Sequence, residues 1–222
     1  MLTKPDGRLR FGREADKVMA KKRKTRAPVQ QRSVEKKGKI LDAAYKVFCA
    51  KGFYKTTTVE IARRAGVSIG SLYSYFVDKN DLFSVVLDRY DSEFDALRAR
   101  TVAPVGGKAR TPAETVRTIL TALLEEHEAS RALNREIKML SFSDPAIAAR
   151  VERQAEKIQE AVRANLASRR GELRLADLDA AAVVIWKTIS GVVDCLVFEP
   201  PVIDRQRIIE ATVDALSAYV LK

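Results

Sequence analysis

Helical spacing of apolar residues is the feature that most restricts the fold of this chain. From Ile40 to Val220, apolar residues recur every three or four positions, as on one face of an α-helix. No segment shows the strict alternation of apolar and polar residues that marks a half-buried strand. With 46% apolar residues among 222, the chain can bury a sizeable core. The pattern predicts an all-α fold of about nine helices without internal repeats.

Positive charge is concentrated at the N-terminus. Residues 1–39 hold fourteen Lys and Arg against four Asp and Glu, whereas the other 183 residues hold 26 basic and 25 acidic side chains. The run 21–26 (KKRKTR) has no apolar periodicity. We therefore expect residues 1–35 to form a basic, disordered arm, which is either a free solvated tail or a segment that contacts the phosphates of a polyanion.

Composition and cysteine spacing exclude several classes of protein. The longest purely apolar run, 180–186, is far shorter than the roughly 20 residues of a membrane span. Residues 1–30 contain no apolar signal-peptide core. Cys49 and Cys195 lie far apart and form no CxxC pair, so they predict neither a zinc site nor a disulfide. We expect a cytoplasmic protein with no membrane partner.

Capping residues mark the expected helix ends. We expect Gly52 to end the first helix in a left-handed conformation, and Thr57 and Glu60 to begin the second with a reciprocal capping box. The break at 104–108 (PVGGK) is the best internal boundary. Further N-caps are predicted at Ser68, Asp78, Thr111, Asp144 and either Asp177 or Asp179.

A helix-turn-helix pattern occupies residues 57–76. Two short helices that cross closely need a small residue in the first, a glycine in the turn and a buried branched residue in the second. Ala62, Gly66 and Leu72 provide these three in the spacing of a DNA-binding helix-turn-helix. A chance helical hairpin could contain the same three residues, but the neighbouring basic arm favours DNA binding.

The residues around this pattern resemble a known family. The shared motifs are 40–44 (ILDAA) with Phe48, 51–53 (KGF), 56–59 (TTTV), 61–62 (IA), 65–68 (AGVS), 70–76 (GSLYSYF) and Lys79. They closely resemble the DNA-binding domain of tetracycline-repressor (TetR/AcrR) family transcription regulators. The resemblance implies a DNA-binding domain with a connecting helix at 36–100, followed by a ligand-binding and dimerisation domain at 104–222.

The resemblance also implies DNA contacts at matching positions. It implies that the helix starting at Ser68 enters the major groove, and that Lys79 holds a phosphate near the start of the fourth helix. Tyr73 and Tyr75 are implied to contact phosphate or sugar, and a role in the core stays open for both. The full implied set is Thr57, Thr58, Ser68, Ile69, Gly70, Ser71, Tyr73, Ser74, Tyr75 and Lys79.

Direct recognition of bases is predicted to be weak. The positions closest to the bases, 69–71 and 74, contain no Arg, Lys, Asn or Gln that could make bidentate base contacts. Ile69 can pack on a thymine methyl group, and a serine can donate or accept a hydrogen bond. Specificity then has to come substantially from half-site spacing and groove shape. Entry of the arm into a minor groove stays open as a further source, and contact of the arm with phosphates is favoured.

The C-terminal half resembles the family's dimerisation domain. In the family, the last two long helices pair across a two-fold axis into a four-helix bundle, and residues 180–198 and 208–220 resemble that surface. A buried helix in a monomer is the alternative. One stripe of the first segment carries Lys187, Ser190, Gly191 and Asp194, and its small residues permit close helix contact. The resemblance further implies a ligand cavity, for which His127, Phe142 and Trp186 are candidate borders or simply core residues.

These features predict a dimeric, sequence-specific transcription regulator, a repressor that a small-molecule ligand releases from a near-palindromic operator on nucleoid DNA. A ligand-independent architectural DNA-binding protein is the alternative, and a response of DNA binding to a ligand separates the two.

An enzyme is disfavoured, because the chain has one His and no phosphate loop, HExxH or Ser-His-acid pattern. The run 125–128 (EEHE) cannot converge on one site, since adjacent helical positions point apart. We expect no cofactor and no metal.

Deletion of residues 1–33 is expected to weaken DNA binding most at low salt and to flatten the dependence of affinity on salt. Each phosphate that the arm neutralises releases a counterion, so loss of the arm lowers the slope of log K against log salt. The measurement is a salt titration of full-length and truncated protein on DNA with A·T-rich and G·C-rich flanks. An unchanged slope would show that the arm does not contact DNA, and an effect limited to A·T-rich flanks would place it in the minor groove.

Overall fold

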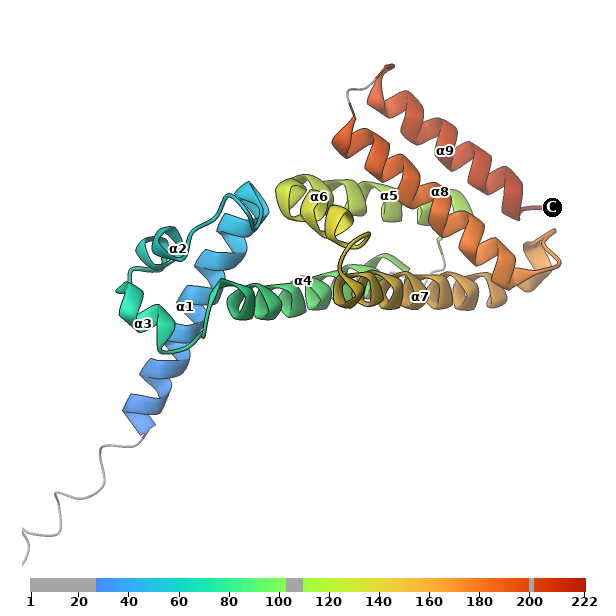
Figure 1. The fold of residues 1–222 in the computed structure, drawn as a ribbon. Coiled ribbons are helices and arrows are strands. Elements are labelled where there is room, and N and C mark those ends of the chain that lie inside the picture. Colours follow the sequence, from blue (N-terminus) through green and yellow to red (C-terminus); the bar gives the residue numbers. More distant parts are fainter. Residues whose placement is uncertain (1–26, 103–109, 200–201) are drawn as a thin grey trace, which may run out of the picture.

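The computed structural model describes residues 27–102, 110–199 and 202–222. A 3-10 turn, Arg170–Glu172, and an isolated bridge between Leu173 and Leu221 accompany the helices of these ranges. The helices are nine in number (Figure 1): α1 Ala27–Lys51, α2 Thr58–Ala65, α3 Ile69–Tyr73, α4 Lys79–Val102, α5 Pro112–Ala129, α6 Arg131–Leu140, α7 Pro145–Ala167, α8 Leu178–Phe198 and α9 Arg205–Val220. The all-α prediction is confirmed.

The helices form two units that share α4 (Figure 1). Helices α1, α2 and α3 lie at the start of α4, where α1 packs on it, and α4 then runs alongside α7 into the C-terminal half. Helices α8 and α9 lie side by side at the end of the molecule opposite α3. The predicted DNA-binding and dimerisation surfaces therefore lie at opposite ends of the described chain.

The range predicted as a disordered arm overlaps the first described helix. Residues 1–26 lie outside the described residues, but α1 begins at Ala27, so residues 27–35 are helical and not disordered. Apolar periodicity starts at Ile40 because residues 31–37 project beyond the core and are mostly exposed. Gln, Glu, Lys and Arg have high helix propensity, which lets the helix extend past the surface on which it packs.

Most of the predicted helix ends are confirmed. Gly52 follows α1 with a φ of 79°, in the left-handed region that favours glycine. Thr111 and Glu114 form the reciprocal capping box at the start of α5. Asp144 and Asp177 accept hydrogen bonds from backbone amides at the starts of α7 and α8. These ends depend on local sequence, which is why the sequence predicts them.

The capping box predicted at α2 is half present. Thr57 Oγ1 accepts a hydrogen bond from the amide of Glu60 at 3.2 Å, as expected. The Glu60 carboxylate, however, accepts from Lys51 Nζ at 2.5 Å. Lys51 ends α1 and comes within reach when α1 and α2 pack together. A tertiary ion pair has therefore replaced the local half of the box.

Two hydrophobic cores hold the chain together. The first lies among α1–α4 and includes the fully buried Phe48, Leu72 and Leu82. It also takes in Leu133 from α6 and Ile147 from the start of α7. The N-terminal unit is therefore packed against α6 and α7 as well as connected through α4. The boundary predicted at 104–108 lies outside the described residues.

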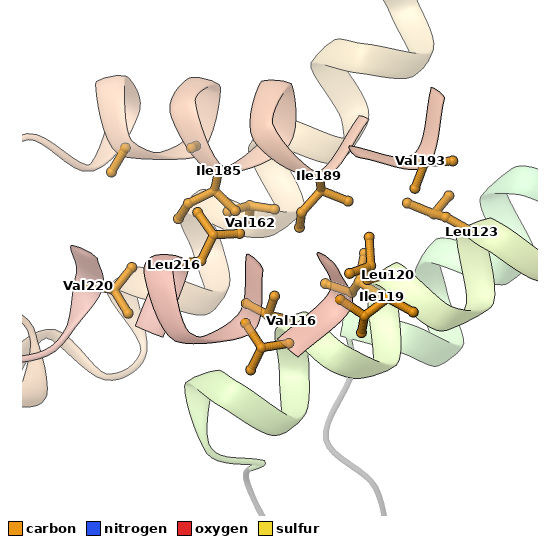
Figure 2. Packing of buried hydrophobic residues seen from close by; sticks show 14 of the residues in the cluster. Val116, Ile119, Leu120, Leu123, Val162, Ile185, Ile189, Val193, Leu216 and Val220 are labelled. Carbon is orange, nitrogen blue, oxygen red and sulfur yellow. The ribbon is translucent and has the colours of Figure 1, made fainter. Parts of the chain in front are cut away.

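The second core lies among α5, α7, α8 and α9. Figure 2 shows Leu120, Val162, Ile189 and Leu216, one from each helix, gathered in this layer. Leu97, near the end of α4, joins the same core. Helix α8 contributes the most residues from a single face, namely Ala181, Ala182, Ile185, Ile189, Val193 and Val197.

Helix α8 is more apolar than the run 180–186 indicated. Its length and its mean hydropathy of 1.8 match those of a membrane-crossing helix, although the central helix of a protein core has the same properties. In this chain α8 packs on α5, α7 and α9. Asp194 of the predicted stripe pairs with Lys138 of α6 at 2.5 Å, whereas Lys187 and Gly191 of the same stripe are exposed. Val183 and Val184 lie four and three residues before Lys187, so they are on the side of the stripe and leave apolar groups uncovered there.

Replacement of Leu120 by Ala is expected to lower the free energy of unfolding by about 2–5 kcal/mol, because its fully buried side chain leaves a cavity in the second core. Met139→Ala, on an exposed side chain of α6, is the matched control and should change the same free energy by less than about 0.5 kcal/mol. Urea denaturation followed by circular dichroism measures both. Equal effects of the two substitutions would contradict the assigned core.

Candidate nucleic-acid interface

The helix-turn-helix has the geometry that its sequence predicted. Gly66 adopts a φ of 68° at the end of α2, and the amide of Val67 donates to the carbonyl of Ala62 at 3.0 Å. This arrangement ends α2 in one tight turn. Ser68 then begins α3 by accepting a hydrogen bond from the amide of Ser71 at 3.1 Å. Ala62 and the fully buried Leu72 pack the two helices against α1 and α4.

The outer face of α3 is open to solvent. Ile69 is 39% exposed and Gly70 is exposed without side-chain atoms near it. The Ser68 hydroxyl caps the helix, and that of Ser74 donates to the Ser71 carbonyl at 2.7 Å. These two hydroxyls therefore already hold backbone groups. This face offers a base an aliphatic side chain, bare backbone and few polar groups.

Tyr73 and Thr58 form one polar unit on this side of the domain. The Tyr73 hydroxyl and Thr58 Oγ1 are 3.0 Å apart, which joins the end of α3 to the start of α2. Tyr73 is 49% exposed, so about half of the residue is accessible to solvent. Thr57, the neighbouring cap, is also exposed. The structure thus brings the two threonines and Tyr73 together, as a shared backbone contact requires.

The Tyr75 hydroxyl already has a partner within the protein, whereas the sequence predicted that it contacts DNA. Its hydroxyl lies 3.1 Å from Ser33 Oγ, on the part of α1 that the sequence assigned to the disordered arm. One turn further along α1, Lys37 Nζ lies 5.6 Å from the centre of the Phe76 ring. Sequence reasoning missed Ser33 and Lys37 as members of this surface. A prediction that residues 27–39 are helical would have placed Ser33 and Lys37 on one face, because they are four residues apart.

Lys79 is anchored within the protein. Its Nζ donates to the carbonyls of Phe53 and Thr56, at 2.9 and 3.1 Å, and lies 4.1 Å from the centre of the Phe53 ring. Two of its three N–H groups are therefore used, and one remains for a phosphate. At the same helix start, Asp78 and Asp81 already accept backbone amide hydrogen bonds. The contact of Lys79 with a phosphate stays a prediction. The structure shows in addition that Lys79 holds two backbone carbonyls of the protein.

The loop 52–56 that Lys79 holds is also bound from the C-terminal half. The carboxylate of Glu136, on α6, accepts hydrogen bonds from the amides of Phe53 and Tyr54, the second at 3.3 Å. A second link joins α4 to α6, where the Tyr90 hydroxyl donates to Asn134 Oδ1. Burial raises the pKa of Tyr90, so this hydroxyl stays protonated and keeps donating. The position of the helix-turn-helix thus depends on α6.

The other candidate groups form no catalytic arrangement. Burial lowers the pKa of His127, whose Nδ1 lies 2.9 Å from the Leu123 carbonyl. Burial raises the pKa of the Cys49 thiol to about 12. Within the described ranges, no group of three or more His, Cys, Asp or Glu could hold a metal ion. These side chains are therefore packing residues.

The three candidate borders of a ligand cavity have different positions. Trp186 lines a small cavity between α4, α5, α7 and α8. His127 packs edge-on against Phe94, with ring centres 5.5 Å apart, and Phe94 lines the same cavity. Phe142 is 86% exposed in the turn between α6 and α7, so its assignment to a cavity is wrong. Aromatic type alone does not indicate on which side of a helical layer a residue lies.

Two family models match this fold. The family described as bacterial regulatory proteins, tetR family, matches residues 40–86, and a tetracyclin repressor-like C-terminal domain matches residues 111–219. The chain belongs to the TetR family. It is therefore a DNA-binding transcriptional regulator, which confirms the expectation that it is not an enzyme.

Individual proteins resemble this TetR-family regulator over different lengths. HbdR of Aromatoleum sp. is 44% identical over 63 residues, which are 27% of this chain and 28% of HbdR, so the chain matches less than a third of that relative. TtgR of Pseudomonas putida is 28% identical over 195 residues, covering 83% of this chain and 91% of TtgR. A solved TetR-family regulator from Mesorhizobium loti superposes with a TM-score of 0.68 at 20% identity, covering 86% and 99% of the two chains. At that identity the structural likeness shows the fold alone.

Replacement of Lys79 by Met is expected to lower the free energy of unfolding of the DNA-free protein by about 1–3 kcal/mol, because two carbonyls of the loop 52–56 lose a charged donor. Lys55→Met, on an exposed side chain of the same loop, is the control and should have little effect. Urea denaturation provides the measurement, and equal stabilities of the two variants would contradict the anchoring role. If Lys79 also binds a phosphate, the salt slope of DNA binding falls by about 1 and all sequences weaken alike.

Proposed function

We propose that this protein is a homodimeric repressor that binds a near-palindromic operator and is released from it by a small-molecule ligand. It would act in the cytoplasm on nucleoid DNA. The observation that carries the proposal is the uncovered surface of α8 and α9, at the end of the chain opposite an exposed recognition helix. Two such chains joined through α8 and α9 would present two α3 helices to one duplex, as repeated half-sites require.

The exposed side of the last two long helices supports a helix-to-helix contact. On α8, Val183 and Val184 are 42% and 45% exposed, and Gly191 is exposed further along the helix. Helix α9 exposes Ala211, Ala215 and Ala218, which are spaced by four and three residues and so lie on one face. Small residues let helix axes approach closely, and an uncovered apolar face favours association.

The proposed DNA contacts follow from the exposed face of the helix-turn-helix. Ile69, Gly70, Ser71 and Ser74 would face base edges in the major groove, on the helix that Ser68 begins. Because this set has no long polar side chain, half-site spacing and groove shape would supply much of the specificity. Thr57, Thr58, Tyr73, Tyr75 and Lys79 would bind the sugar-phosphate backbone.

A ligand effect on DNA binding requires a physical connection between the two halves of the chain. Helix α4 belongs to both cores, and α6 binds the loop 52–56 through Glu136 and α4 through Asn134. A ligand that binds one arrangement of α4 and α6 better than another would shift the spacing of the two recognition helices. These contacts support release by a ligand over ligand-independent architectural binding.

Ala215→Arg is expected to convert the protein from a dimer to a monomer, because a charged side chain on the exposed face of α9 cannot be buried against a second copy. Ala164→Arg, on an exposed alanine of α7, is the control and should leave the dimer intact. Sedimentation equilibrium measures the mass of each variant. A monomeric wild-type protein would overturn the dimer.

The same variants test the operator and the ligand response. Footprinting of the wild-type protein should show two protected half-sites whose centres are separated by about 10 bp or a multiple of it, and Ala215→Arg should lose this pattern. Protection of single, unrelated half-sites would contradict a near-palindromic operator. Operator binding that no small molecule alters would favour the architectural alternative.

A further inference from the structure

Two small cavities lie next to each other inside the second core. One, of about 40 Å³, lies between α5, α7 and α8, and the other, of about 30 Å³, is bordered by α4 as well. Both have Ile119, Val162 and Ile189 in their walls, and the pair is called the apolar slot below. Figure 2 shows these three side chains within one layer of the core. Their aliphatic surfaces favour an apolar ligand body.

The charged side chains that border the apolar slot are both arginines. Arg98 borders it from α4 and Arg169 from just beyond α7, and no Asp or Glu of the described chain lines it. Arg98 Nη2 lies 3.0 Å from Asp95 Oδ1, but Asp95 also pairs with Lys157 at 2.8 Å. Hydrogen bonds from Lys157 and Arg98 lower the pKa of Asp95, so a single negative charge is shared by two cations. The wall therefore has surplus positive charge.

Each arginine has donor capacity that no carboxylate uses. Arg98 Nε is buried and has no hydrogen-bond acceptor among the described residues. A buried donor without an acceptor is unfavourable, and native proteins seldom keep one without a reason. Arg169 Nη2 donates to the backbone carbonyl of Arg110 at 2.7 Å. An acceptor with negative charge would satisfy Arg98 at the wall of the slot.

We propose that the apolar slot binds a small apolar monocarboxylate, with the carboxylate on Arg98 and the hydrocarbon body among Ile119, Val162 and Ile189. The inference rests on the proposed function for the consequence of binding, which is release of DNA. A carboxylate provides the missing acceptor and compensates the surplus charge. An amine of the same length would add a positive charge to a positive wall, and an alcohol would leave that charge uncompensated.

The size of the slot makes its occupation a conformational event. Cavities of about 40 and 30 Å³ hold a few water-sized groups, whereas a benzene-sized ligand occupies a cavity of roughly 150 Å³. The ligand therefore binds an expanded arrangement of the helices and favours it by differential affinity. Phe94, Leu97, Arg98 and Thr101 form the α4 wall of the slot. Expansion thus displaces the helix whose other end belongs to the DNA-binding unit.

The chain contains a natural reporter for this site. Trp186 is its single tryptophan and lines the slot, so its fluorescence reports binding independently of DNA. The full-length protein is titrated with octanoate, octanol and octylamine, each below the concentration at which it aggregates. We expect octanoate to change the Trp186 fluorescence saturably. The affinity for octanoate should be about tenfold or more above the affinities for octanol and octylamine, because one charge-assisted hydrogen bond supplies about that factor.

Substitution of the arginine separates charge recognition from simple apolar binding. Arg98→Gln should weaken octanoate binding about tenfold or more and leave octanol binding unchanged, because the hydrocarbon walls remain. Arg135→Gln, on an exposed arginine of α6, is the control and should change neither. Thermal unfolding shows whether each variant is folded. The comparison of the three probes on wild-type protein needs no variant, so it decides the proposal even if Arg98→Gln does not fold.

The outcomes distinguish this inference from the proposed function. Equal affinities for the three probes, or no saturable signal with octanoate, would overturn the inference. Selective octanoate binding that leaves the operator complex intact would keep the carboxylate site and contradict release of DNA through it. Release of the operator by another compound, without any octanoate binding, would keep the proposed function and remove the carboxylate site.

Discussion

The participation of α4 in two hydrophobic cores is the constraint on which the rest of the structure depends. Leu82 and Val86 are fully buried in the first core, and Leu97 is buried in the second. The partly buried Phe94 packs against both. A helix of 24 residues is about 36 Å long, so α4 reaches from the unit that contains α3 into the C-terminal half. One helix therefore supports both cores.

Polar contacts add to this connection where the two halves meet. The loop 52–56 has its carbonyls on Lys79 and its amides on Glu136, so it is held by the start of α4 and by α6 at once. These partners come from segments far apart in the sequence. Their removal would leave backbone groups of a short loop without partners, which makes this loop sensitive to any displacement of α6. The two halves of the chain are therefore joined by polar contacts at one short loop.

Local chemistry explains which expectations held. Gly66, Ser68, Thr111 and Asp144 act within three or four residues of themselves, and the structure confirms each of these helix ends. The expectations that failed concern long-range contacts or exposure. Residues 27–35 continue α1, the Glu60 carboxylate pairs with Lys51, and Phe142 lies at the surface. No pattern of apolar residues signals an exposed polar helix, because that pattern records burial alone.

The sequence by itself determined the helical class, the helix-turn-helix and the family, since periodicity, caps and the Ala62, Gly66 and Leu72 spacing act over short distances. The tertiary structure alone decided which partners the charged and aromatic side chains found. It placed Lys79 on carbonyls of the loop 52–56, Ser33 beside Tyr75 and Arg98 at an apolar slot. Such contacts join residues that are far apart in the sequence. Their distance in space is set only when the helices pack, so the sequence pattern does not predict them.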